Sequence, residues 1–419
     1  MLDCIQFRRY DRGVTDVAAS LQQASTRFHP PEPVAAEGRA TRVGSIDIVR
    51  GAVMVLMALD HVRDFVTNLR FQPENLERGS AALFATRWVT HFCAPAFFLL
   101  AGVGIGIAKA RGQTTAALSR FLVTRGLWLI VVELTFSAVG WRFDFNLMPL
   151  FGIVLWALGW SMMVMAGLIW LPRGLLAGLS IATIALHNLT DSMRPADLGA
   201  WAPLWHFLHV PGFAIPGTLL IAYPLVPWVA VMTLGFVLGD IYRWDAQRRR
   251  RFLIWTGVAA TAIFIALRAF NGYGNPQPWA AQRTPALTVA SFLNVTKYPP
   301  SLQFLLMTLG PTFVVLAFAE RMRGRIAAWM KVYGNVPFFF YVVHIFVAHL
   351  VGVMLALIQG GELRRIPVVL DPTSLPDWYG VSLPGVYIAW ALVVVAMYFP
   401  CRWFARIKRT RSHWWLRYL

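Results

Sequence analysis

Hydrophobic residues gather in long runs, separated by short polar segments, along almost the whole chain after residue 45. Most runs approach the ~20 residues that an α-helix needs to cross the ~30 Å hydrocarbon core of a bilayer. The pattern therefore predicts an all-α, polytopic integral membrane protein with about ten transmembrane helices. The predicted spans are residues 46–66, 87–108, 119–140, 149–171, 174–188, 219–241, 251–270, 302–320, 335–358 and 383–404.

Some of these spans carry signs of irregularity. The fifth, 174–188, is short enough to be partly re-entrant. Pro95 is expected to kink the second span, and the prolines of "AYPLVPW" mark either a helix start or a kink in the sixth. The small residues of "AGVGIG" in the second span favour close contact with another helix.

The composition agrees with a membrane protein. Of the 419 residues, 57% are hydrophobic and only 14% are charged, whereas an ordinary soluble domain has about 25% charged residues. The 18 Trp and 29 Phe fit aromatic belts at the two membrane surfaces. An ordinary soluble globular protein is thereby excluded.

The formal net charge of +18 comes mostly from short loops. With a cytoplasmic N-terminus, the basic segments "KARGQTTAALSR", "LPRG", "YRWDAQRRRR" and "RMRGRIAAWMK" all fall inside, while the longest loops, near 189–218, 271–301 and 359–382, fall outside. This distribution follows the positive-inside rule and predicts that both termini are cytoplasmic. Topology explains the charge, so we expect no nucleic-acid partner.

Three segments are predicted. Residues 1–41 have basic groups but no apolar core of a signal peptide, so they read as a poorly ordered basic cytoplasmic tail. Residues 42–408 form the transmembrane domain, and 409–419 form a basic cytoplasmic C-terminal tail. The three cysteines have neither a disulfide framework nor a metal-binding spacing, so no metal site is expected.

The first span combines hydrophobic length with ionisable groups. Arg50 and His61 are eleven positions apart, which places them within about 20° of each other around a helix and about 16 Å apart along it. Asp47 lies one turn before Arg50 on nearly the same face. Two interpretations stay open: this face lines a substrate path, or its charges form an interhelical network that fixes packing.

These residues carry a resemblance. The pattern Asp47-x-x-Arg50-Gly51 followed by His61 resembles the first-helix signature of the acyltransferase family 3 enzymes and of the related heparan-alpha-glucosaminide N-acetyltransferase family. The phrases "SIDIVRG", "MALDHVRD" and "TRWVTHFCAPAFFLLAG" are similar to bacterial members of the latter's catalytic domain. The resemblance is best over 42–108 and returns at 334–344.

The resemblance implies that cytoplasmic acyl-coenzyme A, most simply acetyl-coenzyme A, donates its acyl group to a hydroxyl or amine of a glycan-type acceptor on the outer side. His61 is then the general base, since its unperturbed pKa lies near 6.5. Asp64, three residues on, has better geometry than Asp60 to orient the imidazole. Arg50, held by Asp47, would bind a phosphate of the donor.

Further residues are candidates for the same site. Arg120 and Arg125 at the third-span entry can bind donor phosphate or simply anchor the topology. His91 is expected at a depth similar to His61, so the two can pair around one cavity. The predicted cavity residues are Asp60, Arg63, Arg87, Glu133, Tyr341 and His344. Structural hydrogen bonds or ion pairs are the alternative for each, and for Glu133 the alternative is an arginine partner.

Two other histidines and two other functions complete the picture. His206 and His209 have helical spacing but are a weak metal signal.

A proton-coupled transporter and a non-catalytic membrane scaffold are the alternative functions, since intramembrane His, Asp and Arg also form proton relays. The expected partners are acyl-coenzyme A, the glycan acceptor, membrane lipid and possibly a second copy. No covalently bound cofactor is expected, and the expected location is the bacterial cytoplasmic membrane.

Overall fold

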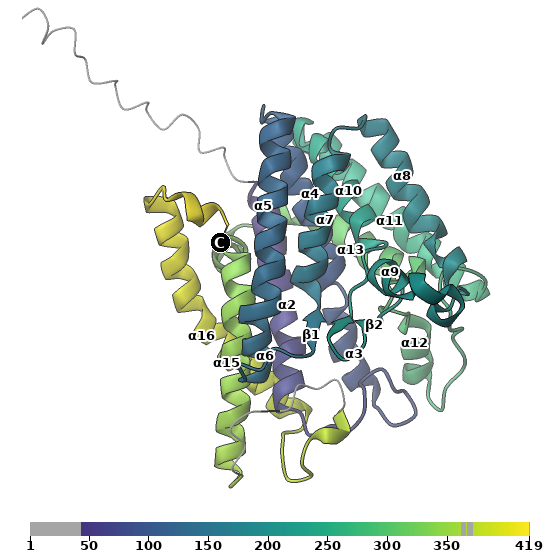
Figure 1. The fold of residues 1–419 in the computed structure, drawn as a ribbon, viewed down its shortest axis with the longest axis vertical. Coiled ribbons are helices and arrows are strands. Elements are labelled where there is room, and N and C mark those ends of the chain that lie inside the picture. The colour runs from purple at the N-terminus through teal and green to yellow at the C-terminus, as the bar shows by residue number, and fades with distance from the viewer. Residues whose placement is uncertain (1–42, 362–365, 367–371, 419) are drawn as a thin grey trace, which may run out of the picture. The chain divides into compact units, whose positions relative to one another are not determined.

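The structure of the protein is a computed structural model that describes residues 43–361, 366 and 372–418. The predicted tail 1–41 lies outside the described residues. The unit Gly44–Leu419 is mostly helical, as Figure 1 shows. The longer helices are α2 (Gly44–Val66), α3 (Ala81–Thr90), α4 (Cys93–Ala110), α5 (Thr115–Val132), α7 (Val154–Leu168), α8 (Arg173–Leu186), α10 (Trp228–Leu238), α11 (Ala246–Phe270), α13 (Leu302–Ala319), α15 (Pro337–Ile358) and α16 (Leu383–Thr410).

Shorter elements connect these helices. They are the π-helical turn η1 (Glu133–Ser137), α6 (Ala138–Arg142), η2 (His187–Thr190), η3 (Pro195–Trp201), α9 (Ala202–Leu208), η4 (Gly239–Arg243), α12 (Pro285–Leu293), α14 (Gly324–Gly334), η5 (Pro372–Ser374) and η6 (Trp414–Arg417). A small sheet has the order β1-β3-β2, formed by Leu150–Gly152, Leu219–Ile221 and Gly212–Ile215. β1 pairs parallel and β2 antiparallel with β3.

Six helical segments of the described chain are long and apolar enough to cross a membrane. They are Ala81–Ala110, Thr115–Arg142, Ala246–Phe270, Leu302–Ala319, Pro337–Ile358 and Leu383–Thr410. A mostly helical protein with several membrane-capable helices is therefore confirmed. The count of ten spans and the cytoplasmic side of both termini stay predictions.

Side-chain caps explain where several helices begin. Ser80, Thr114, Asp245 and Ser301 each accept a hydrogen bond from the backbone N–H three residues on. Such caps satisfy one of the N–H groups that have no partner within the helix. The outcome is that α3, α5, α11 and α13 start at defined points.

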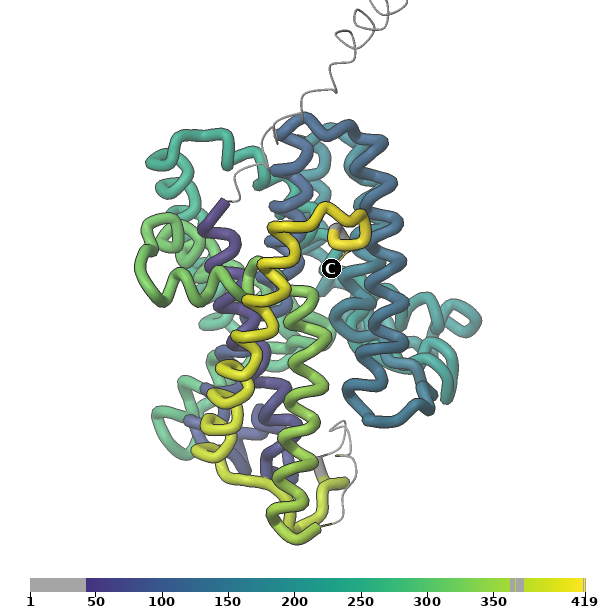
Figure 2. The backbone as a smooth tube through the Cα atoms, turned by 90° about the vertical axis from the view of Figure 1, so that its left-hand side faces the viewer, coloured from purple at the N-terminus to yellow at the C-terminus, as the bar shows by residue number. Residues whose placement is uncertain are grey.

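Helix α2 lies at the centre of the unit. It packs against α3, α4, α13, α14, α15 and α16, and Figure 2 shows α15 and α16 running alongside it. Ala58 and Val62 are fully buried in these contacts. Because α2 faces protein on so many sides, its ionisable groups can meet partners rather than lipid.

Glycines allow α4 and α10 to cross at very short range. A Cβ added to Gly102 would lie 1.9 Å from the carbonyl oxygen of Met232, and one on Gly106 would lie 2.2 Å from that of Phe236. In return, Gly235 faces the Leu99 carbonyl and Gly239 faces the backbone of Gly106. Close helix contact at "AGVGIG" is thus confirmed.

Three spans differ from the prediction at their ends. The second span breaks between Thr90 and Cys93, so Pro95 lies in the first turn of α4, where its missing N–H costs nothing. The fourth and sixth spans begin as strands, at Leu150 and Leu219, instead of helix. Short hydrophobic runs do not distinguish a buried strand from a helix. Helix α10 begins at Trp228, directly after the second proline of "AYPLVPW".

Candidate functional site

His61 of α2 pairs with His344 of α15. Nδ1 of His61 lies 2.8 Å from Nε2 of His344, and the two rings stack with centroids 5.0 Å apart. Nδ1 of His344 lies 2.8 Å from the carbonyl oxygen of Phe340. A carbonyl can only accept, so Nδ1 of His344 carries a proton, and in a neutral His344 the Nε2 atom accepts from His61.

This chain of hydrogen bonds fixes the tautomer of His61. Its Nδ1 carries the proton that is donated to His344, which leaves Nε2 with a lone pair. Within the described residues, the hydrogen bond of the His61 ring is the one from Nδ1, and none involves Nε2. The geometry therefore presents one basic nitrogen, and His344 accepts a hydrogen bond from His61 instead of supplying one to a substrate.

Aromatic and acidic side chains surround the histidine pair. Trp141 of α6 stands edge-on to His61 with ring centroids 4.9 Å apart, and Tyr341 does so at 6.4 Å. Tyr341 is also a close neighbour of Glu133. One oxygen of Glu133 accepts a 2.6 Å hydrogen bond from the backbone N–H of Leu155.

Glu133 therefore has a structural role that the sequence did not indicate. It opens the π-helical turn η1, a type of helix irregularity that often occurs at functional sites. Its carboxylate lies at the start of α7, where Ile153 supplies no side-chain cap. That oxygen satisfies one of the backbone N–H groups that have no partner within α7. No arginine pairs with Glu133 among the described residues.

The C-terminal half of α2 joins a largely buried network of ion pairs. Asp60 bridges Arg63, at 2.7 Å, and Arg87 of α3. Arg63 also binds Asp64 at 2.7 Å, and Arg87 binds Glu74 at 2.6 Å. Pairing, rather than exposure to water, therefore offsets the cost of these charges. Asp64 is bonded to Arg63, so the predicted orientation of His61 by Asp64 is replaced by His344.

Glu74, in the loop between α2 and α3, shows how strongly the network acts. Burial by itself raises the pKa of its carboxyl, but the charge and hydrogen bond of Arg87, the neighbouring His91 and the charge of Arg63 together outweigh burial and hold that pKa well below its ordinary value. His91 lies 3.9 Å from Glu74, and neither of its ring nitrogens is hydrogen-bonded within the described residues. No described contact joins His91 to His61, so the predicted pairing of these two is not what the structure contains.

Lys297 and Tyr298 reach this region from the loop before α13. Lys297 is only 9% exposed, and its charge acts on both Asp60 and His61. Its ammonium stands 5.1 Å from the Tyr298 ring and has no acceptor among the described residues. The Tyr298 hydroxyl lies 3.3 Å from that of Tyr223. Sequence reasoning missed these residues because nothing marks a lysine and a tyrosine in a long loop.

A buried arginine holds that loop in place. Arg268 of α11 is 1% exposed and donates to four backbone carbonyls around the loop. The acceptors are Phe292, Gln277, Ser291 and Asn294, at 2.8–3.0 Å. Asn275 adds a hydrogen bond from the backbone N–H of Thr296 at 2.7 Å. Lys297 is therefore presented by a rigid segment.

The other end of α2 carries the predicted donor-side residues. Arg50 lies 3.6 Å from Asp47, as the spacing predicted. Arg125 of α5 is close enough to Arg50 for their charges to interact, and its guanidinium stands 5.2 Å from the Phe338 ring. Arg120 is exposed and takes no part in this group.

Glycines set the position of α2 at this end. A Cβ on Gly51 would lie 1.8 Å from the carbonyl oxygen of Met330, and one on Gly334 would lie 1.8 Å from that of Asp47. Helices α2 and α14 therefore touch backbone to backbone beside Arg50.

The remaining histidines have structural partners. His349 accepts from the Ile366 N–H at 2.9 Å and contacts the Gly140 carbonyl at 3.0 Å. His209 binds Asp191 at 2.9 Å, and His206 binds the Val210 carbonyl. In the part of the chain that the structure describes, no group of three or more His, Cys, Asp or Glu is arranged to hold a metal.

The fold and the site define a class, namely membrane proteins with several membrane-capable helices and a partly buried pair of histidines beside an ion network. Residues 42–270 match the family model described as heparan-alpha-glucosaminide N-acetyltransferase, catalytic. The match covers more than half of the 419 residues, so the chain belongs to this family. Membership implies transferase activity and confirms the resemblance carried by the first span. No curated protein gave a match to the chain.

Proposed function

We propose that the protein is a membrane acyltransferase. It moves an acyl group, most simply acetyl, from cytoplasmic acyl-coenzyme A to a hydroxyl or amine of a glycan-type acceptor on the outer side. Membership of a transferase family supports the reaction class. The observation that carries the proposal is the hydrogen-bond chain from His61 through His344 to the Phe340 carbonyl, which leaves a basic nitrogen on α2, at the centre of the helical unit.

His61 acts as the general base. Nε2 takes the proton from the acceptor hydroxyl or amine as that group attacks the thioester carbonyl carbon. The new C–O or C–N bond forms, and the carbon–sulfur bond then breaks. The imidazolium returns the proton to the departing thiolate, so the histidine is regenerated. Nε2 of His344 stabilises the imidazolium, because it accepts a hydrogen bond from Nδ1 of His61 throughout the reaction.

The donor lies along α2. Arg50 and Arg125 bind phosphates of acyl-coenzyme A at one end of the helix, and arginine suits this because its planar fork matches phosphate oxygens. Arg50 and His61 are about 16 Å apart along an uninterrupted helix. The extended arm of coenzyme A covers a distance of this order, so its thioester comes to His61. Lys297 adds positive charge where the tetrahedral oxyanion develops.

The proposal is tested with purified protein, acetyl-coenzyme A and glucosamine as a simple acceptor. Release of free thiol together with acetylated sugar is expected from the wild type. The His61→Ala variant is expected to lose at least about 100-fold in rate, since a positioned base contributes that much or more. His413→Ala, which changes an exposed histidine, is the matched control.

Unchanged activity in the folded His61→Ala variant would overturn the assignment of the base. Uptake of solute into proteoliposomes along a pH gradient, without donor consumption, would instead support a transporter. If no product forms but the wild type binds acetyl-coenzyme A and Arg50→Gln does not, only the choice of acceptor is wrong. If the wild type does not bind acetyl-coenzyme A, the whole proposal is wrong.

A further inference from the structure

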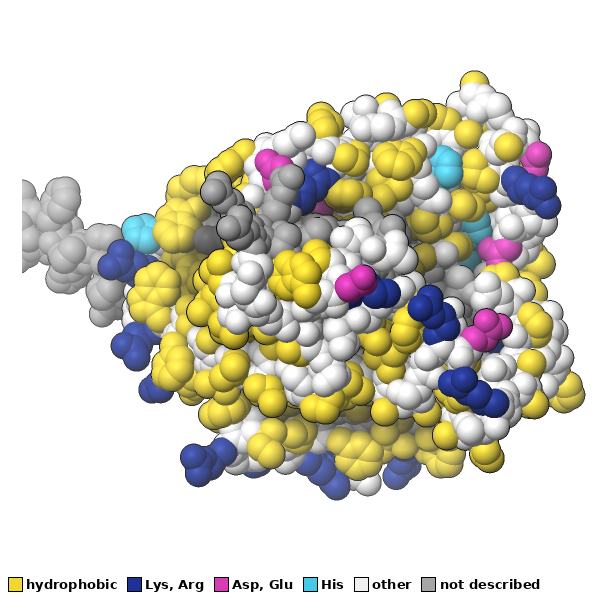
Figure 3. All heavy atoms as spheres, turned by 90° about the horizontal axis from the view of Figure 1, so that it is seen from below, with side chains coloured by type: hydrophobic (Ala, Val, Ile, Leu, Met, Phe, Trp, Pro, Cys, Tyr) yellow, Lys and Arg dark blue, Asp and Glu magenta, His cyan; other side chains and the backbone are white. Residues whose placement is uncertain are grey.

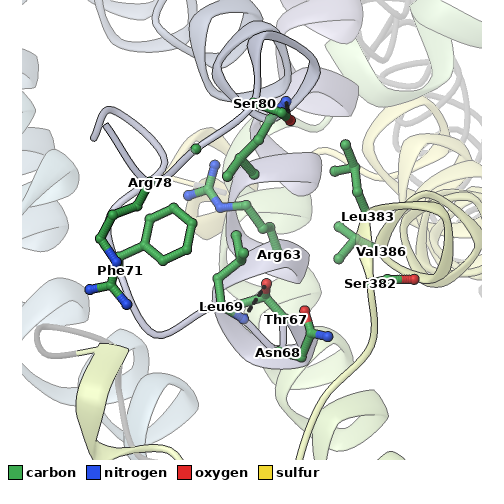
Figure 4. Close-up of a pocket in the computed structure, with 12 residues that line it drawn as sticks. Arg63, Thr67, Asn68, Leu69, Phe71, Arg78, Ser80, Ser382, Leu383 and Val386 are labelled. Atoms are coloured by element: carbon green, nitrogen blue, oxygen red, sulfur yellow. Dashed lines mark hydrogen bonds between the residues drawn. The ribbon is translucent and has the colours of Figure 1, made fainter. Parts of the chain in front are cut away.

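A pocket of about 280 Å³ lies where α2 ends and α3 and α16 begin. Figure 4 shows Arg63 extending from α2 into the space between the loop that carries Phe71 and Arg78 and the start of α16. Ser80 and Ser382 also line the pocket. This place is separate from the donor end of α2, and nothing in the proposed reaction requires it.

The charged side chains that line the pocket are both arginines. Arg63 and Arg78 are among the residues that line it, and no described carboxylate does so. Asp60 and Asp64 bind Arg63 through Nη2. Nη1 of Arg63 has no hydrogen-bond partner within the described residues, although the residue is only 3% exposed. A buried guanidinium N–H without an acceptor is costly unless a ligand supplies one.

Two helices point their N-termini at the same pocket. Ser80 is the N-cap of α3 and Ser382 is the N-cap of α16. Ser80 caps the Leu83 N–H, whereas the Ser382 side chain makes no cap hydrogen bond. The free N–H groups and the dipole of a helix N-terminus favour an anion. Both helices therefore add to the attraction of the two arginines.

The walls of the pocket are held in place. Backbone hydrogen bonds join Asn68 to Val381 and Val381 to Val66, at 3.1 and 2.8 Å. Arg283 donates to the carbonyls of Glu77 and Gly79, each at 3.0 Å. The guanidinium of Arg78 rests 4.8 Å from the Phe71 ring. A ligand would meet a preformed site and would not have to order these loops.

We propose that this pocket binds an anionic oxygen group, a phosphate, sulfate or carboxylate. Arg63 and Arg78 donate to its oxygens, and the N-termini of α3 and α16 add their partial charge. The group can belong to an acidic sugar or to the headgroup of an anionic lipid, since the recognising chemistry is the same. Figure 3 looks onto this end of the unit, where basic and acidic side chains are interspersed among uncharged ones.

Calorimetry on the purified, detergent-solubilised protein tests the proposal with two matched pairs of probes. One pair is glucose 6-phosphate and glucose, and the other is dihexanoyl phosphatidylglycerol and dihexanoylglycerol, which lacks the phosphate. At least one anionic probe is expected to bind at least about tenfold more tightly than its partner without net charge, as expected for hydrogen bonds to a charged group. The pair that shows this difference identifies the source of the anion.

Arg78→Gln is the informative variant because Arg78 is exposed and its removal leaves the ion network intact. It is expected to weaken the anionic probe about tenfold. Arg194→Gln, at an exposed arginine that does not line the pocket, is expected to bind like the wild type. Equal binding of the charged and uncharged probes, or wild-type affinity in Arg78→Gln, would overturn the proposal. Neither measurement depends on acyl transfer.

Discussion

His61 depends for its orientation on a residue 283 positions further along the chain. If His344 holds the productive tautomer, a side chain that accepts a hydrogen bond should replace it better than one that only fills the space. We expect His344→Phe to lower kcat for acetyl transfer about 10- to 100-fold, because Nδ1 of His61 then loses its acceptor. His344→Gln, whose amide oxygen can accept, should recover most of the rate.

The measurement is steady-state kinetics with acetyl-coenzyme A, together with the thermal midpoint of each variant in detergent. KM for the donor should stay near the wild-type value in both variants, since His344 does not touch the donor-side arginines. Equal losses in the Phe and Gln variants, or a loss that follows the thermal midpoint, would show that His344 only supports packing.

Glu74 gives a pH prediction whose sign follows from its lowered pKa. The ordinary pKa is 4.5, and in the folded protein Arg87 holds it well below that value. Stability from this carboxylate is therefore fully present above about pH 5 and is lost as the pH falls below 4.5 towards the folded-state pKa. Glu74→Gln should thus unfold at a lower temperature than the wild type at pH 7, and the difference should shrink towards pH 3.

Thermal unfolding in detergent at several pH values checks this. Glu77→Gln is the matched control, since Glu77 is exposed in the same loop and forms no ion pair with a described residue. A gap between wild type and Glu74→Gln that stays constant from pH 7 to pH 3 would contradict the role given to the Arg87–Glu74 pair.

At the level of elements, the crossing of α4 and α10 is the clearest consequence of sequence. Gly106→Ala would place a Cβ 2.2 Å from the Phe236 carbonyl oxygen, whereas a Cβ on Gly104 meets no atom within 4 Å. We expect Gly106→Ala to cost about 1–3 kcal/mol, as overpacking does. Gly104→Ala, on the same helix, should leave stability unchanged or slightly raised because alanine favours helix.

The comparison is the midpoint of thermal unfolding of the two variants in the same detergent. Equal midpoints would mean that the two helices separate easily, and that the backbone contact does not constrain the bundle.

Helices could be predicted from the sequence, but the contacts between distant helices could not. The shared face of Asp47, Arg50 and His61 follows from helical periodicity alone, and α2 is an uninterrupted helix. The partner of His61 could not be derived, because periodicity says which face a residue occupies but not which distant helix covers that face. Glu133 was found as a buried acid, yet the start of α7 that it caps was expected to be mid-helix. No sequence motif marks Lys297, because the loop that presents it is held by Arg268 of the preceding long helix and not by neighbouring residues.

At the scale of the whole molecule, the distribution of basic residues predicts how the chain is oriented in the membrane. The chain has 38 Lys and Arg against 20 Asp and Glu, and the basic excess lies in alternate loops. A bilayer accepts such a chain most easily with those loops in the cytoplasm. This prediction puts the C-terminal segment on the same side as the start of α5, and the Tyr418 hydroxyl lies 2.9 Å from that of Thr124 on α5.

Single-cysteine labelling of intact cells tests the orientation. With Cys4 changed to Ser, and with Cys93 and Cys401 buried, a cysteine at Arg194 should react with a membrane-impermeant maleimide added outside. One at Arg248, in the first turn of α11, should react only after the cells are opened, because the start of α11 is predicted to be cytoplasmic and a charged reagent does not cross the bilayer. Both positions are exposed, so access to the side chain is not the limit. Labelling of the Arg248 position from outside would reverse the topology and, with it, the side from which acyl-coenzyme A must enter.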